Sequence, residues 1–384
     1  MPGQRIETID LWRGLVLVMI FINHIPGNPL EHLTLRNYGF SDSAEAFVFV
    51  SGLAVSYAYF PKVVAGDLLG AVRRCVQRAV KLYGVHVLIT LAALVLFGQA
   101  FLATRIPSLV VDHGRDISFM EPMRALVGLA LMSHQLGYFN ILPLYVALML
   151  MAPVLLLAAR IHTLLALAVS ALLYLASRWF DFALPTWPIQ GRWFFDPFSW
   201  QLIFTIGLVC GIEWRSRPLP YARTLFIGSL AVVWASFALV TDALGQSPGL
   251  YDAARHYLDL TKTDLGLTRL VHFLALAYLV SQLRLGNALL RLPGADKLML
   301  LGRNGLGVFA AGSLASALGQ ILLAISDDSP VVGVIFVLTG ILGLIVVASI
   351  LEWSAASSSS DRRSSPRRPS SVWPAPRHGP TSKG

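Results

Sequence analysis

The sequence is a succession of long apolar segments separated by shorter polar stretches. An apolar segment of about 20 residues is what an α-helix needs to cross the hydrocarbon core of a bilayer. Hydrophobic residues make up 55% of the chain and charged residues only 13%, a composition that excludes a soluble globular domain. The sequence therefore predicts an all-α, polytopic helical bundle embedded in a membrane.

The apolar segments predict about ten transmembrane helices. Their approximate ranges are 8–25, 43–60, 80–103, 140–159, 163–177, 200–214, 224–242, 267–283, 300–325 and 331–351. A further apolar piece, 124–137, is short, and we expect a re-entrant or half-buried helix there, because a crossing would place the later cationic loops outside the cell. With ten crossings and the Lys- and Arg-rich loops inside, both termini are expected in the cytoplasm.

The chain is expected to divide into a transmembrane domain, 1–353, and a disordered basic cytoplasmic tail, 354–384. The tail is rich in Ser, Pro and Arg and carries +5 of the net charge of +9, so the basic excess does not indicate a nucleic-acid partner. The basic tail is a candidate to contact anionic lipid headgroups. Cys75 and Cys210 fall toward the cytoplasmic side, where a structural disulfide is not expected, and no zinc spacing predicts a metal site.

The first apolar segment carries Arg13 near its start and His24 near its end. Eleven positions bring the two residues to within about 20° of the same helix face, roughly 16 Å apart along the axis. Ionisable groups at such depths are costly and commonly line a cavity or pathway. One helix face thus presents a fixed cation and a titratable base. The alternative is that Asp10 pairs with Arg13 at the interface and that His24 only marks the helix end.

The second apolar segment opens with two carboxylates, Asp42 and Glu45, at a depth matching that of His24. A carboxylate there can fix the tautomer of an imidazole and stabilise its protonated form, which supports a general base. Glu45 is the predicted partner of His24, and Asp42 is a competing candidate that also suits a helix N-cap. Further along, Ser51 and Gly52 are expected to allow close helix packing.

Cations cluster where the third segment begins and where the ninth does. Arg73, Arg74 and Arg78 share helical spacing, and Arg303 stands beside Asn304. Guanidinium groups grip phosphate bidentately, so these arginines are candidates to bind the phosphates of a nucleotide-like donor. The alternatives are positive-inside anchoring for the first three and snorkelling of Arg303 toward the headgroups.

Two outer loops are candidates for binding an acceptor. Trp193 and Asp196 belong to a long aromatic loop whose flat rings and polar groups suit stacking on sugars, although an interfacial aromatic belt explains it equally well. Arg36 lies in the connector between the first two segments, which is either part of an acceptor site or an ordinary surface loop.

A third group of polar residues precedes and enters the eighth segment. Arg269 and His272 lie three apart on one helix face, with Lys262 just outside the segment. An Arg and a His in the outer half of a transmembrane helix could bind an anionic acyl group. Helix packing with internal hydrogen bonds is the alternative.

Six stretches in order between about residues 8 and 312 resemble a known family. They are DLWRGLVLVMIFINHIPGN, LTLRNYGFSDSAEAFVFVSGL, YFNILPLYVALMLMAP, WFFDPFSWQLIFTIG, RLVHFLALAYL and LGRNGLGVF. With the Arg and His eleven positions apart, they resemble the OpgC-type branch of the integral-membrane O-acyltransferase superfamily, which succinylates osmoregulated periplasmic glucans. Where the superfamily often has a His in the penultimate helix, this chain has Gly312 and Ser313, which leaves His24 as the principal base.

The resemblance implies a multi-pass acyltransferase of the bacterial inner membrane that uses succinyl-CoA or acetyl-CoA and has a glucan or another polysaccharide as acceptor. We expect the donor thioester to reach His24 through a continuous internal passage, and His24, oriented by Glu45, to deprotonate the acceptor hydroxyl. The cations expected near the donor phosphates are Arg13, Arg73, Arg74, Arg78 and Arg303. The candidates to bind a succinyl carboxylate are Arg36, Lys262 and Arg269.

Two alternatives stay open. An acyl-His intermediate is a variant of direct transfer. A function of another class, a transporter or proton-coupled flippase, accommodates His24, Glu45 and His272 as a proton relay. We see no inverted repeat with matching broken helices, which weakens the transporter hypothesis.

Overall fold

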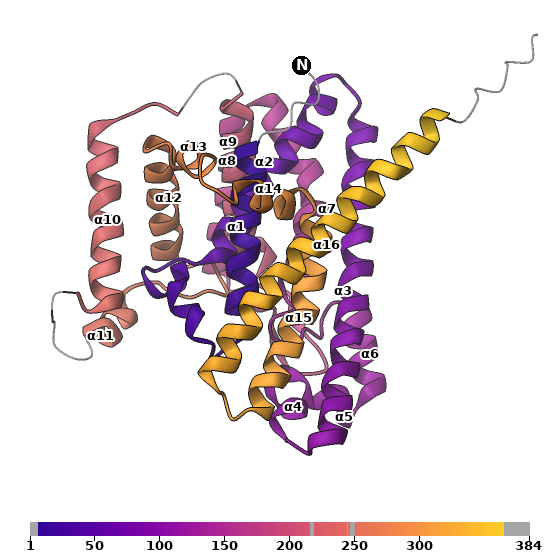
Figure 1. Ribbon diagram of the computed structural model, residues 1–384. Helices are drawn as coiled ribbons and strands as arrows, with labels where there is room; N and C mark the ends of the chain where they lie inside the picture. Colours follow the sequence, from indigo (N-terminus) through magenta and orange to yellow (C-terminus); the bar gives the residue numbers. More distant parts are fainter. Residues whose placement is uncertain (1–6, 216–218, 244, 246–249, 365–384) are drawn as a thin grey trace, which may run out of the picture.

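The computed structural model describes residues 7–215, 219–243, 245 and 250–364. Within these ranges the regular structure is almost entirely helical, and the helices form a bundle (Figure 1). The exception is a small antiparallel hairpin of β1 (Pro185–Thr186) and β2 (Gly191–Arg192). The all-α prediction is therefore confirmed.

Long helices account for the predicted transmembrane segments. In the described ranges, the helices of at least 16 residues are α1 (Glu7–Asn23), α2 (Ser43–Val64), α3 (Leu68–Thr104), α7 (Ile141–Ile161), α8 (Thr163–Trp179), α9 (Pro197–Glu213), α10 (Arg223–Thr241), α12 (Leu267–Gln282), α15 (Gly305–Ile325) and α16 (Pro330–Ser364). Six of them, α2, α3, α7, α10, α15 and α16, are long and apolar enough to cross a membrane. The count of ten crossings and the side on which the termini lie stay predictions.

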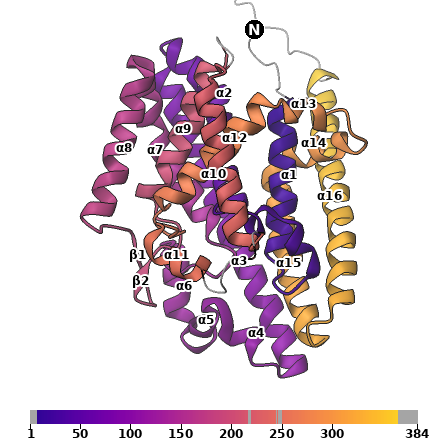
Figure 2. The ribbon, with the colours of Figure 1, turned by 90° about the vertical axis from the view of Figure 1, so that its left-hand side faces the viewer.

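Short helices connect the long ones. They are η1 (Pro29–Leu33), η2 (Leu35–Asn37), α4 (Ser108–Val111), η3 (Asp112–Gly114), α5 (Asp116–Met120), α6 (Pro122–Ala130), α11 (Leu250–Tyr257), α13 (Leu285–Leu289) and α14 (Ala295–Arg303). Helices α4 to α6 lie at the end of the bundle opposite the start of α1 (Figures 1 and 2). Helix α6 falls in the segment expected to be re-entrant, and nine residues, about 14 Å, are too few to cross the bilayer.

Three helix boundaries differ from the predicted ones. Helix α3 begins at Leu68, so the cationic stretch predicted to precede it forms its first turns. The predicted helix over 300–325 is broken at Asn304, whose φ of −99° and ψ of 26° are not helical. Asn304 Nδ2 donates to Leu300 O at 3.1 Å and to Glu352 Oε2 at 2.9 Å, so side-chain bonds stabilise the break. Helix α16 continues past 353 to Ser364, and the rest of the predicted tail lies outside the described residues.

Helices α2 and α9 approach closely in the middle of the bundle. A Cβ atom at Gly52 would collide with the carbonyl oxygen of Phe204, and one at Gly207 would collide with that of Phe49. Small residues allow such backbone contact between membrane helices, as predicted for Ser51 and Gly52. The close approach fixes the position of α2, which carries both Asp42 at its N-cap and the predicted Glu45 in its first turn.

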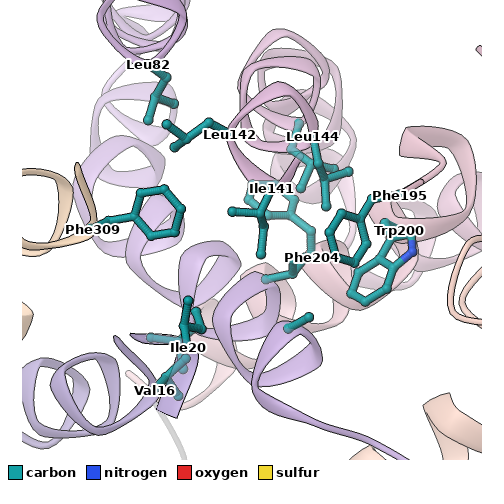
Figure 3. Close-up of a cluster of buried hydrophobic side chains, with 14 of the residues drawn as sticks. Val16, Ile20, Leu82, Ile141, Leu142, Leu144, Phe195, Trp200, Phe204 and Phe309 are labelled. Atoms are coloured by element: carbon teal, nitrogen blue, oxygen red, sulfur yellow. The ribbon is translucent and has the colours of Figure 1, made fainter. Parts of the chain in front are cut away.

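The bundle is apolar both inside and on its outer faces. Large buried side chains such as Trp200, Phe204 and Leu144 fill the core (Figure 3). On α16 the exposed side chains form an apolar stripe of Val331, Ile335, Leu338, Leu342, Val346 and Ile350. Helices α8 and α16 lie on opposite sides of the bundle (Figure 2). An exposed apolar stripe of this length is typical of a helix that faces lipid.

Candidate functional site

A cavity of about 530 Å³ lies among α1, α2, α3, α7, α14, α15 and α16. Among the described residues, its lining includes the cations Arg13, Arg78, Lys81 and Arg303 and no acidic residue. Lys81 is exposed, so the cavity meets the surface of the bundle beside that side chain. Figure 3 shows three apolar lining residues, Leu82, Leu142 and Phe309, pointing toward one another from three helices. The cavity thus combines a cationic part with apolar walls.

Of the four cations of the cavity, two have a carboxylate partner among the described residues and two do not. Arg13 donates to Gly302 O at 3.3 Å and lies 3.4 Å from Asp10 Oδ1, so the alternative ion pair predicted for it is present. Arg303 pairs with Glu352 at 3.3 Å. The described residues supply no ion-pair partner for Arg78 or Lys81, so the lining as a whole attracts anions.

Three of the five cations expected near donor phosphates line this cavity, namely Arg13, Arg78 and Arg303. Arg73 and Arg74 are exposed on α3 and do not line it. Arg73, five positions before Arg78, points about 140° away from it around the helix, whereas Arg74 shares the face of Arg78 but lies one turn closer to the start of α3.

Three aromatic side chains of the cavity lining lie close together. The ring of Phe47 lies 6.0 Å from that of Tyr145 and 6.1 Å from that of Phe309, and we refer to these three residues as the aromatic layer. Of the α2 residues that line the cavity, Phe47 lies nearest the start of α2. His24 is not among the described residues that line this cavity, so the cavity does not form the continuous passage predicted from Arg13 to His24.

His24 follows the last residue of α1 and is partly exposed. Its carbonyl oxygen accepts a hydrogen bond of 2.8 Å from Gln320 Nε2 on α15. Its ring centroid lies 5.2 Å from that of Tyr138, in a tilted arrangement. Among the described residues, none forms a hydrogen bond with either ring nitrogen, so both nitrogens stay available to a substrate.

Four charged side chains from three segments form a compact ionic cluster, which consists of Asp42, Glu45, Lys262 and Arg269. Lys262 Nζ lies 2.5 Å from Asp42 Oδ2, and Arg269 Nη2 lies 2.6 Å from Glu45 Oε1 and 3.4 Å from Asp42 Oδ2. Glu45 is fully buried, and two cations balance the two carboxylates. Burial alone would raise the pKa of Asp42, but Lys262 and Arg269 hold it well below its usual range. Asp42 is therefore ionised at neutral pH.

The predicted contact between Glu45 and His24 is wrong. The Glu45 carboxylate accepts the Asp42 backbone N–H at 2.9 Å, as part of a capping box at the start of α2, and accepts from Arg269 Nε at 2.7 Å. These bonds turn Glu45 toward α12, where a buried cation compensates its charge. The role of orienting His24 therefore falls to other residues.

The polar residues predicted before and within the eighth apolar segment lie near one another in the structure. Arg269, His272 and Lys262 all meet the segment that starts α2: Arg269 and Lys262 join the ionic cluster, and His272 Nδ1 lies 2.7 Å from Ser41 Oγ. Arg36 stands apart, exposed on η2 and paired with Glu31 at 3.6 Å. Of the predicted acyl-binding cations, two are thus in the cluster and one is outside it.

The aromatic loop before α9 does not present the predicted residues to a ligand. Trp193 is 4% exposed and Asp196 is fully buried. Asp196 caps α9 by accepting Ser199 N–H at 2.9 Å and also accepts from Ser177 Oγ at 3.0 Å. The predicted sugar contacts of Trp193 and Asp196 are therefore corrected to packing and capping roles, because both side chains are buried.

Sequence reasoning missed three residues near His24 and the ionic cluster. Tyr138 contacts the imidazole, Gln320 holds its backbone, and Ser41 binds His272. Uncharged residues at the ends of apolar segments give no signal of depth or partner, so charge and spacing did not single them out.

Comparison with known proteins agrees with the sequence resemblance. A family model described as OpgC protein matches residues 5–356, which include all six resembling stretches. No match was found among curated proteins or solved structures. Among the described residues, no group of three or more His, Cys, Asp or Glu side chains is arranged to hold a metal ion.

Proposed function

Because the chain belongs to the OpgC family, we propose that it is a membrane-embedded O-acyltransferase that moves a succinyl group from succinyl-CoA to hydroxyl groups of an extracytoplasmic glucan. The observation that carries this proposal is the position of two side chains: Arg13 on α1 lines the cationic cavity, and His24 directly follows the last residue of the same helix. An anionic donor and a neutral acceptor would thus approach one helix from opposite ends.

The cavity supports an acyl-CoA donor. Guanidinium and ammonium groups bind phosphate, and the lining contains three arginines and one lysine. The apolar walls beyond them suit the uncharged arm that carries the thioester. In the proposed complex the phosphates contact Arg78, Lys81 and Arg303, and the arm points along α1 toward the aromatic layer.

The aromatic layer has to open for transfer. Rotation of Phe47 or Phe309 about its side-chain bonds would let the arm pass between α2 and α15. We place the acyl group, once through, between the layer and His24. The donor thus brings its thioester to the base only when it is fully bound.

The proposed reaction needs one base. His24 accepts the proton of a glucan hydroxyl, and the resulting oxygen attacks the thioester carbonyl carbon. The C–S bond then breaks, the CoA sulfur takes the proton from the imidazolium, and the products are a glucan ester and free CoA. For a succinyl group, Lys262 is the proposed partner of the free carboxylate, because its side chain is 32% exposed whereas that of Arg269 is 12% exposed.

The experiment that tests this function is acyl transfer by the purified protein in detergent. Labelled succinyl-CoA and a glucan should give labelled glucan and an equal amount of free CoA, with acetyl-CoA as the competing donor. A transporter or flippase would give neither product without compartments, so loss of both would contradict the proposal and favour the alternative. Transfer from acetyl-CoA alone would leave the acyltransferase and replace the succinyl assignment.

The first variant to test the donor cavity is Arg78→Ala. A hydrogen bond to a charged group contributes about 1.5–3 kcal/mol, so KM for succinyl-CoA should rise by roughly 10-fold to 150-fold with kcat little changed. The matched control is Arg73→Ala, five positions earlier on α3 and exposed, which should change KM less than about threefold. Equal effects of the two variants would show that the cavity is not the phosphate site.

A further inference from the structure

His24 lacks the carboxylate that usually orients a catalytic imidazole, because Glu45 is committed to Arg269. In most His sites a hydrogen bond to the second ring nitrogen fixes the ring orientation. The ring contact that the structure describes for His24 is with Tyr138. We propose that Tyr138 is a positioning residue whose aromatic ring orients the His24 imidazole. This inference rests on the proposed function.

The backbone of His24 is held separately from its ring. Gln320 Nε2 donates to the His24 carbonyl, and Arg115 Nη1 reaches Gln320 Oε1 at 3.4 Å. Arg115 is itself fixed, since Nη2 donates to Ser108 O at 2.9 Å and the guanidinium carbon lies 4.0 Å from the Phe97 ring centroid. With the backbone anchored, rotation of the side chain is the freedom that remains, and the Tyr138 ring limits that rotation.

Tyr138 is carried on a strained piece of backbone. Its φ is 72°, in the left-handed region, where a residue with a side chain costs about 1–2 kcal/mol. Its ring packs edge to face on His113, with centroids 4.9 Å apart, and His113 has a φ of 61°. The Gly137 N–H donates to His113 O at 2.9 Å, so the two strained turns support each other. Strain of this kind concentrates where a side chain must be aimed.

The ring of Tyr138, and not its hydroxyl, is the group that acts. Burial raises the pKa of the Tyr138 phenol, so the side chain is uncharged at neutral pH. The hydroxyl forms no hydrogen bond with a residue in the described part of the chain. Contact of His24 with the ring is therefore the interaction to be tested, and phenylalanine should preserve it.

The test compares Tyr138→Ala with Tyr138→Phe in the succinyl transfer assay. A misplacement of about 1 Å in a catalytic group costs about 100-fold, so we expect kcat of Tyr138→Ala to fall by 10-fold to 100-fold. KM for succinyl-CoA should stay within about twofold, because the donor cavity is lined by other residues. Tyr138→Phe should keep kcat within about twofold. The matched control is Tyr221→Ala, which removes a tyrosine ring that is 63% exposed.

Two further measurements keep the inference open to refutation. The first is CoA binding, which shows that a variant is folded. The second is the variant His113→Gly, which removes the ring behind Tyr138 and relieves the strained φ of residue 113. This variant should lower kcat without loss of thermal stability. A wild-type kcat in both Tyr138→Ala and His113→Gly would overturn the positioning role, as would an equal loss in Tyr138→Phe and Tyr138→Ala. If the unmodified protein transfers no acyl group, the proposed function fails and not the positioning alone.

Discussion

His24→Ala should lower kcat for acyl transfer by about 10²-fold to 10⁴-fold while the protein still binds CoA and unfolds at the same temperature. The reason is that a positioned general base contributes a factor of that size, and no second imidazole stands at the place in α15 where Gly312 and Ser313 are found. Steady-state kinetics with labelled succinyl-CoA measure the loss. Thermal unfolding in detergent checks the fold.

The control for this experiment is His32→Ala. His32 is exposed on η1, eight positions after His24, and has no role in the proposed mechanism, so its variant should keep the wild-type rate. Activity above about a tenth of the wild-type value in His24→Ala would remove His24 as the base. An acyl group trapped on His24 in the absence of acceptor would favour the acyl-His mechanism over direct transfer.

Arg269→Met should destabilise the protein by roughly 3–5 kcal/mol, because it leaves the buried Glu45 carboxylate without its cation. Denaturant unfolding in detergent measures this change, with expression level as a second indicator. The matched control is Lys262→Met, which removes a more exposed cation and leaves Asp42 paired with Arg269, so its effect should be clearly smaller.

A second substitution separates charge from packing. Glu45→Gln keeps an oxygen for the Asp42 backbone N–H but removes the negative charge, so Glu45→Gln combined with Arg269→Met should recover most of the lost stability. If Arg269→Met alone is as stable as the wild type, the ionic cluster does not hold α12 against α2. If the double variant is no better than Arg269→Met, packing of the guanidinium and not its charge is what matters.

Helix positions were predictable because burial in lipid imposes a length and a composition on each segment. The break at Asn304 was not, since no proline marks it and its partner Glu352 lies 48 positions later in the chain. The start of α3 was placed too late for a similar reason: charged residues such as Arg73 interrupt the hydropathy signal without interrupting the helix.

The residues of the candidate site were likewise predictable only in part. Charged residues inside apolar segments drew attention to Glu45 and Arg269, and the structure brings these two together. Which cation meets which carboxylate depends on how α12 packs on α2, and spacing along one helix carries no information on that contact. Tyr138 could not be found from the sequence, because an aromatic residue at the start of a membrane segment is first explained by its preference for the interface.

The aromatic layer has a consequence for the cell as well as for the reaction. The cavity opens on one face of the bundle, and charged residues lie near the other face. Without the rings of Phe47, Tyr145 and Phe309, the bundle would offer a hydrated route for protons and small ions. Hydrophobic constrictions of this kind expel water and block conduction. In the proposed mechanism, the rings that the acyl chain displaces would therefore also block ion flow through the bundle between turnovers and so preserve the electrical gradient across the membrane.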